Sequence, residues 1–303
     1  MTKMELSPND DYFHAPTTDE RWWSETYWFS FDDPVTGLSG TFYPLLRKNL
    51  DIAALTVAVW GPEQETVWTA PYFRTYWHLK PPVFENNSME LEGLRYDVLE
   101  PLNQYRVRYQ DGDAISADLT FTGITDNHVP VALPDVGHWD QPVKVEGTLT
   151  LGGHEVQLNC HGMRDRSWGP RLDSNSARAS YVYGINDNAS FLVITQMSNE
   201  PWSVSGYLEV DGVRRPIKEA TQEIERDNWQ RASAVLITGK DEDDRPLNIY
   251  GKARNHIGKQ ASPGYFAWMS MFEWDFAGGA LGEFQDVWSP DRLSLQASNR
   301  FFS

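Results

Sequence analysis

The segment from Gly162 to Arg171 has the residue types that chemistry most often uses. It reads Gly-Met-Arg-Asp-Arg-Ser-Trp-Gly-Pro-Arg, and it lies between two runs that have the pattern of β-strands. A strand favours alternation and a turn favours Gly, Pro or Asn, so neither explains three arginines, one carboxylate and one tryptophan in ten residues. The segment therefore predicts either a buried ionic network or a ligand site.

The position of Asp165 within this segment leaves both interpretations open. Arg164 and Arg166 flank it and are able to hold its carboxylate ionised in a bidentate pair, which would make Asp165 a poor proton donor. If the strand alternates, the two arginines share one face and Asp165 shares the other with Ser167. The first arrangement predicts a salt-bridge network that joins two domains, and the second predicts a catalytic carboxylate.

A second polar group lies at His138-Trp-Asp-Gln141, just before a predicted strand. It places a base, a ring, an acid and an amide in four residues. One interpretation makes Asp140 or His138 a general acid or base whose pKa is tuned by burial beside Trp139. The other is a capped loop with polar groups at the surface.

Metal and cofactor motifs are not evident in the sequence. His154, Cys160 and His161 lie close together, but successive residues of a strand point to opposite faces, so Cys160 and His161 do not both face one ion. We expect no metal there. The sequence has no Gly-x-Ser-x-Gly, no Gly-x-x-x-x-Gly-Lys and no Gly-x-Gly-x-x-Gly that opens a helix, which disfavours hydrolases, kinases and nicotinamide enzymes.

The elements that must position these groups are strands. Apolar and polar residues alternate over 115–122, 144–151 and 204–210, as expected for strands with one buried face. Asp111-Gly112, Gly152-Gly153 and Asp211-Gly212 separate such runs and predict hairpins. We count about sixteen strand candidates, so the predicted fold is all-β and antiparallel, with few helices. The one helix that we expect covers Ile217 to Arg226.

The number of strands predicts two domains. One barrel of about sixteen strands would enclose an aqueous channel, whereas two barrels or sandwiches of about eight strands each are filled by side chains or hold one ligand. We place the boundary in the arginine segment, which gives an N-terminal β domain over 1–165 and a C-terminal β-barrel domain over 166–303. In the second domain, both faces of the stretch 265–276 are largely apolar, which predicts core packing or a ligand cavity.

Composition limits the classes of partner. The chain has 303 residues, and 26 Lys plus Arg against 43 Asp plus Glu give a formal net charge of -17, which disfavours nucleic acid. With Cys160 as its single cysteine the chain forms no internal disulfide, which fits a reducing cytoplasm. The N-terminus is polar, and no apolar run is long enough to span a bilayer. We therefore expect a cytoplasmic protein without membrane insertion, and the sequence leaves its oligomeric state open.

The two polar segments, together with the Val-x-Gly-x-Leu-x-Leu-Gly-Gly run over 145–153, resemble a known family. They are similar to the two-domain lipocalin-like proteins related to carotenoid 1,2-hydratase (hydroxyneurosporene synthase-like) and kievitone hydratase. Cofactor-free cyclases of fungal polyketide pathways look like relatives of the same fold. The resemblance implies two lipocalin-like β-barrel or β-sandwich domains, an apolar pocket in or between them, and no cofactor. It also implies protonation of an alkene by a carboxylic acid and capture of the cation by water, or the reverse.

These observations predict a cofactor-independent hydratase or dehydratase that acts on a small hydrophobic terpenoid, polyene or aromatic molecule. The alternatives are a cofactor-free cyclase or isomerase, and a carrier of apolar ligands without catalysis. The predicted acids and base are Asp140, Asp165 and His138. The predicted substrate-binding residues are Trp139, Arg164, Trp168, Arg171, Tyr183 and Trp268.

Overall fold

The computed structural model describes residues 6–63, 66–133, 136–171, 178–197, 203–262, 264–291 and 294. The chain divides into two compact units, Met1–Gly61 with Ala70–Arg171 and Pro62–Thr69 with Leu172–Ser303. The main division thus lies after Arg171 rather than after Asp165. Strand β12 (His154–Pro170) accounts for the difference, because it continues through Asp165 and stays paired with strands of the first unit up to its end.

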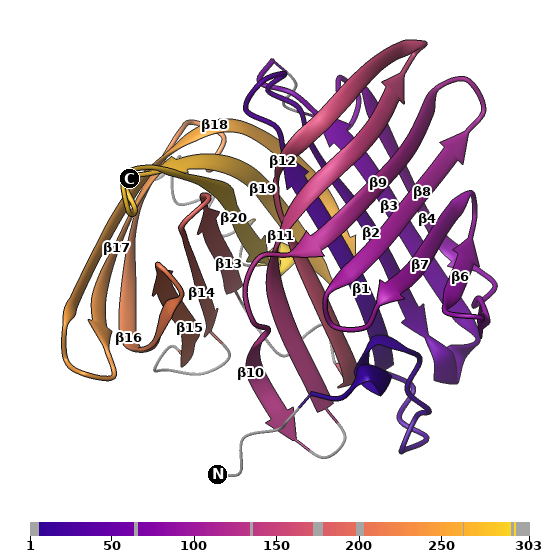
Figure 1. Ribbon diagram of the computed structural model, residues 1–303, viewed down its shortest axis with the longest axis horizontal. Coiled ribbons are helices and arrows are strands. Elements are labelled where there is room, and N and C mark those ends of the chain that lie inside the picture. Colours follow the sequence, from indigo (N-terminus) through magenta and orange to yellow (C-terminus); the bar gives the residue numbers. More distant parts are fainter. Residues whose placement is uncertain are drawn as a thin grey trace. The chain divides into compact units, whose positions relative to one another are not determined.

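The first unit is one antiparallel sheet of twelve strands (Figure 1). Its central strands are β1 (Trp23–Asp32), β12 and β11 (Val136–Leu151), and β11 and β12 form a long hairpin around Gly152-Gly153. The strand order is β4-β3-β2-β1-β12-β11-β9-β8-β7-β6-β5, with β10 paired to β11. The other strands are β2 (Ser39–Arg47), β3 (Ile52–Trp60), β4 (Tyr72–Leu79), β5 (Phe84–Glu85), β6 (Ser88–Leu91), β7 (Leu94–Glu100), β8 (Gln104–Asp111), β9 (Ile115–Gly123) and β10 (His128–Leu133).

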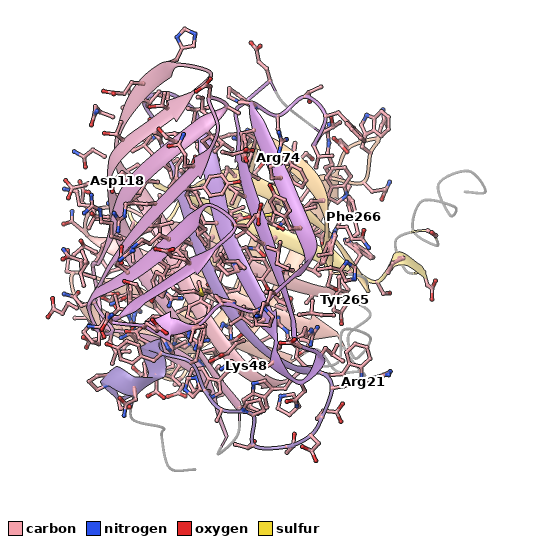
Figure 2. All side chains as sticks on the ribbon, turned by 90° about the vertical axis from the view of Figure 1, so that its right-hand side faces the viewer. Arg21, Lys48, Arg74, Asp118, Tyr265 and Phe266 are labelled. Atoms are coloured by element: carbon pink, nitrogen blue, oxygen red, sulfur yellow. The ribbon has the colours of Figure 1, made fainter. Side chains whose placement is uncertain are left out.

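Alternation places one face of this sheet in an aromatic core. On β9 the residues Ile115, Ala117, Leu119 and Phe121 are buried in that core, as the sequence pattern predicts. The core extends across β1, β7, β8 and β11, and two short 3-10 helices, η1 (Pro8–Asp11) and η2 (Lys48–Leu50), lie in the same unit. The opposite face of β9 is polar. Its Asp118, labelled in Figure 2, forms an exposed ion pair of 2.6 Å with Arg106 on β8.

The second unit is a closed antiparallel barrel of eight strands in sequence order. The strands are β13 (Arg178–Ile185), β14 (Ala189–Met197), β15 (Ser203–Val210), β16 (Val213–Arg226), β17 (Ala232–Asp241), β18 (Pro246–Ser262), β19 (Tyr265–Trp274) and β20 (Ala280–Trp288). Pairing of β13 with β20 closes the barrel. Its apolar core includes Val182, Phe191, Phe272, Trp274 and Phe284. The expectation of two antiparallel β domains is confirmed, and so are hairpins at all three Gly-containing turns.

The expected helix over Ile217 to Arg226 is wrong, since this stretch is part of strand β16 and pairs with β17. Ile217, Ala220 and Ile224 have a spacing that fits one face of a helix. A shift of the strand register between Ile217 and Glu219 produces this spacing, because an extra residue in a strand interrupts the alternation. Beyond the shift, positions 220, 222, 224 and 226 are partly buried and 219, 221, 223 and 225 are exposed.

Among the described residues, no helix is long and apolar enough to cross a membrane.

Candidate active site

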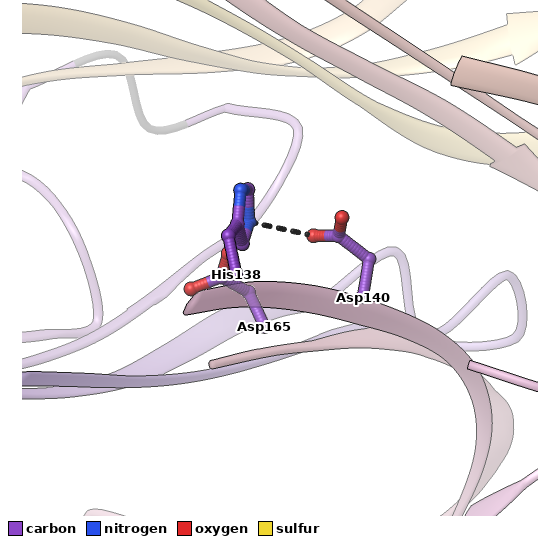
Figure 3. Close-up of side chains that lie close together, drawn as sticks. All are labelled: His138, Asp140 and Asp165. Carbon is purple, nitrogen blue, oxygen red and sulfur yellow. Dashed lines mark hydrogen bonds and ion pairs between the residues drawn. The ribbon is translucent and has the colours of Figure 1, made fainter. Parts of the chain in front are cut away.

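The pairing of β11 with β12 brings His138, Asp140 and Asp165 together on one face of the sheet. In the register of the two strands, Asp140 lies opposite Asp165, and His138 lies opposite Ser167. The His138 Nε2 atom is 3.2 Å from Asp140 Oδ1 and 2.5 Å from Asp165 Oδ2. Figure 3 shows the three side chains beside one another on the two strands. We call this group the His–Asp–Asp triad.

The triad is shielded from water, and this strengthens the interactions among its charges. The side chain of Asp140 is fully buried, while those of His138 and Asp165 are 20% and 16% exposed. Burial by itself would lower the pKa of His138, but Asp140 and Asp165 outweigh it and raise that pKa to about 10. Burial would likewise raise the pKa of Asp165, but the charge and hydrogen bond of His138 outweigh it and hold this pKa below its usual value. Near neutral pH the pair is therefore an imidazolium and a carboxylate.

The triad places a positive charge on His138 beside the acids Asp140 and Asp165. One imidazolium and two carboxylates give the group a formal charge of -1 when both acids are ionised. The imidazolium of His138 is the member that holds a proton near neutral pH, because the two carboxylates raise its pKa and its own charge lowers the pKa of Asp165. Its ligand atoms also lie within 4.8 Å of one another, so the same three side chains would be able to hold a metal ion.

Arg164 points to the other face of the sheet, into the aromatic core. Its guanidinium is fully buried and lies 4.5 Å from the centroid of the Phe29 ring and 4.8 Å from that of Trp139. Its Nη2 atom donates to the hydroxyl of Tyr96 at 3.3 Å and lies 3.6 Å from Asp11 Oδ1. Arg164 and Trp139 therefore lie across the sheet from the triad. Their role in substrate binding stays a prediction.

Arg166 and Trp168 lie on the same core face as Arg164. Arg166 forms a fully buried ion pair of 2.7 Å with Glu25, and Lys48 contacts the other oxygen of Glu25 at 3.0 Å. Trp168 stacks on the ring of His14, with 3.8 Å between the ring centroids. The arginines thus do form a buried network. Its named partners all belong to the first unit, so these contacts stabilise that unit alone. For these contacts, the expectation of a network that joins two domains is wrong.

The structure shows that Asp165 lies on the opposite face of β12 from Arg164 and Arg166. The arginines face the core and pair with Asp11 and Glu25, while Asp165 faces the opposite side and contacts His138. Sequence reasoning missed both acidic partners, because Asp11 and Glu25 have no local pattern that distinguishes them from surface acids. Glu25 is brought to Arg166 by the long-range pairing of β1 with β12, and Asp11 lies in the 3-10 helix η1.

The other predicted residues are Arg171 at the end of the first unit and two aromatic residues of the second unit. Arg171, after the end of β12, is exposed and lies 3.5 Å from the hydroxyl of Ser167, and its charge also helps to lower the pKa of Asp165. Tyr183 on β13 and Trp268 on β19 belong to the second unit, and their contact with a common substrate stays a prediction. Cys160 and His161 are adjacent residues of β12, as expected.

Comparison of the sequence with protein families gives one match that spans most of the chain. Residues 7–285 match the family described as Domain of unknown function (DUF7064). A comparison with curated proteins finds no similar sequence.

Comparison with solved structures shows that the fold recurs. A Nitrosomonas europaea protein provisionally named AttH has a TM-score of 0.67 and 14% identity, with 94% of this chain and 97% of that one covered. CghA in complex with Sch210972 has a TM-score of 0.61 and 12% identity, with 94% and 96% covered. Kievitone hydratase from Nectria haematococca has a TM-score of 0.61 and 10% identity, with 89% and 90% covered. The resemblance to kievitone hydratase is thus confirmed for the fold, and that to carotenoid 1,2-hydratase stays a prediction.

Proposed function

Since this chain belongs to the DUF7064 family, whose description names no activity, we propose its function from the triad itself: a cofactor-independent hydratase or dehydratase of a small hydrophobic molecule. The observation that carries the proposal is the contact of one imidazole nitrogen, His138 Nε2, with the buried carboxylate of Asp140 and the partly buried carboxylate of Asp165, which come from paired strands. Such a group supplies and takes back a proton in a place where water does not compete freely.

The charges assign a role to each member. Asp165 stays ionised beside the imidazolium of His138, so its negative charge stands near any cation that forms on the substrate. In the proposed step Asp140, the fully buried carboxyl group of the triad, acts as the acid. Its O–H bond breaks as a C–H bond forms with the π electrons of an alkene, which leaves a cation on the neighbouring carbon. Water then forms the C–O bond and returns one proton to Asp140, and dehydration is the same sequence in reverse.

Two further observations support a lyase over other classes. The fold is shared with a protein whose name, kievitone hydratase, states the addition of water. The triad also has the proton donor and the ionised base that such a reaction needs. The substrate class, a terpenoid, polyene or aromatic molecule, rests on the family resemblance.

The test follows isotopes from water into the substrate. The purified protein is incubated with a panel of terpenoid alkenes, polyenes and prenylated aromatics in water labelled with deuterium and oxygen-18. Mass spectrometry should find both isotopes in the product of at least one substrate. Asp140→Asn should lower that rate by about a hundredfold or more, the usual contribution of general acid catalysis. The matched control is Asp118→Asn, which alters an exposed carboxylate of the same unit and should leave the rate unchanged.

Other outcomes would identify the alternatives. A product of unchanged mass, formed equally well by the protein with both Asp140→Asn and Asp165→Asn, would replace the hydratase with a cyclase or isomerase. A ligand that binds and is recovered unlabelled would indicate a carrier. Activity that EDTA removes and a divalent metal restores would assign the triad to metal binding instead.

A further inference from the structure

A second charged group lies inside the barrel of the second unit, and no residue of the triad belongs to it. Asp286 on β20 is fully buried and contacts two arginines. Its Oδ1 atom is 2.9 Å from Nε of Arg178 on β13, and its Oδ2 atom is 2.7 Å from Nη1 of Arg226 on β16. The side chains of the two arginines are only 16% and 12% exposed. Two guanidiniums on one carboxylate give these three residues a formal charge of +1.

The strand faces show that this group points into the barrel. Val182, Phe284 and Ile224 belong to the apolar core of the barrel or pack against it. Residues two apart on a regular strand share a face. Ser180 therefore shares the face of Val182, Asp286 that of Phe284, and Arg226 that of Ile224. Asp286 and Arg226 then meet across the interior, since β20 and β16 are not neighbours in the barrel. A polar layer therefore lies next to the apolar core.

Several hydrogen-bond donors in this layer have no acceptor. Among the described residues, none accepts from Nη2 of Arg226, Nε2 of Gln222 or Nε1 of Trp288, although all three atoms are buried. Gln222 already accepts from the hydroxyl of Ser180 at 3.0 Å, which fixes its amide nitrogen as the remaining donor. Buried donors are nearly always paired in folded proteins. Donors that converge beside two guanidinium groups are suited to a group with several acceptor oxygens.

Aromatic rings lie in the same layer. The guanidinium of Arg178 lies 4.5 Å from the centroid of the Trp288 ring, and that of Arg226 lies 5.3 Å from it. In the strand register, Trp288 lies opposite Phe266 and Asp286 lies opposite Trp268, and these two rings of β19 pack edge to face at 5.1 Å. Such rings offer apolar contacts to the part of a ligand that carries no charge.

We propose that the barrel interior of the second unit binds an apolar small molecule through its carboxylate group, which accepts hydrogen bonds from Arg226, Gln222 and Trp288. An eight-stranded barrel is either filled by its side chains or holds one small ligand, and the buried donors without acceptors favour a ligand in this layer. The site goes beyond the proposed lyase activity, and it is independent of it because Asp140, His138 and Asp165 take no part.

The test uses the full-length protein with naphthoate, octanoate and benzoate as carboxylate probes, and with naphthylmethanol as the uncharged counterpart of naphthoate. Calorimetric titration should show saturable binding of at least one carboxylate. Naphthoate should bind about tenfold or more tightly than naphthylmethanol, as expected when a charged hydrogen-bonded contact is lost. This comparison needs no variant. Equal binding of the two, or no saturable binding of any carboxylate, would overturn the proposal.

Variants locate the site. Arg226→Gln should weaken the binding of the carboxylate by about tenfold or more while leaving naphthylmethanol unchanged. The matched control is Arg245→Gln, because Arg245 belongs to the same unit and pairs with Asp243 while its side chain is 55% exposed. Asp140→Asn should also leave binding unchanged, which separates this site from the lyase proposal. Carboxylate binding that survives Arg226→Gln at full strength would refute the site.

Discussion

At the scale of single residues, the charge balance of the candidate site depends on His138. Its imidazolium is the one cation in contact with both Asp140 and Asp165 among the ion pairs of the described chain. The sequence predicted these three residues as a set of candidates, because each is an acid or base beside a strand pattern. It did not predict their contact, since that depends on the register of β11 against β12.

Replacement of this cation tests the charge balance. His138→Gln should lower the free energy of unfolding at pH 7 by about 3 kcal/mol, because the buried Asp140 and the partly buried Asp165 lose their charged partner. The pKa of His138 is raised in the folded protein from 6.5 to about 10. Its stabilisation is therefore fully present below about pH 6.5 and is lost as the pH rises through about 10. The difference between the wild type and the variant should shrink over this range.

Urea unfolding of EDTA-treated protein at several pH values measures this difference. Exposed His78→Gln serves as the control, since His78 lies on the same unit and makes no contact with the triad carboxylates among the described ion pairs. A difference that stays constant from pH 6.5 to 10 would show that His138 does not titrate with a raised pKa.

At the scale of elements, one face of β12 carries the arginines that form buried ion pairs, and the other carries Asp165 of the triad. Alternation was visible in the sequence, and it correctly offered Asp165 a face away from Arg164 and Arg166. The same rule failed on β16, where a register shift imitates helical spacing. Local patterns thus predict which side chains share a face. They do not predict what lies opposite, because buried partners such as Glu25 come from strands far away in the sequence.

Strand β12 lies so close to β1 at Gly162 that a larger residue there should destabilise the protein. A Cβ atom added there would lie 1.8 Å from the backbone oxygen of Ser30, so Gly162→Ala must push the two central strands apart. We expect a loss of about 2–3 kcal/mol in the free energy of unfolding, typical of overpacking. Denaturant unfolding followed by tryptophan fluorescence measures it.

The matched control for this substitution is Gly112→Asn in the hairpin between β8 and β9. Gly112 has φ of 51° and no atom within 4 Å of an added Cβ, and asparagine tolerates this conformation. Its cost should stay well below that of Gly162→Ala. Equal stability of the two variants would mean that β1 and β12 adapt to the extra atom.

At the scale of the whole molecule, the formal charge of -17 is the dominant electrostatic property. Such an excess makes the folded chain repel itself, and dissolved salt screens this repulsion. The buried pairs, such as Arg166 with Glu25, are screened much less than surface charges are. Salt should therefore weaken the repulsion more than it weakens the ion pairs that hold the first unit together.

The melting temperature should accordingly rise with ionic strength. Between low and physiological salt we expect an increase of roughly 2–4 °C, which corresponds to about 1 kcal/mol for a protein of this size. Differential scanning calorimetry in sodium chloride measures it, with choline chloride as the control for specific sodium binding. A melting temperature that falls with added salt would show that surface ion pairs outweigh the net repulsion.

The short stretch Pro62–Thr69 has a consequence for how the chain is made. It is flanked on both sides by the first unit but belongs to the second, where Thr66 pairs with Gly258 in a parallel bridge. Thr66 is synthesised long before Gly258, so the bridge between them cannot form while the strands of the first unit are being made. The bridge from this stretch to β18 forms only after β18 has been synthesised. The second unit therefore includes a piece of chain that is made well before the rest of that unit.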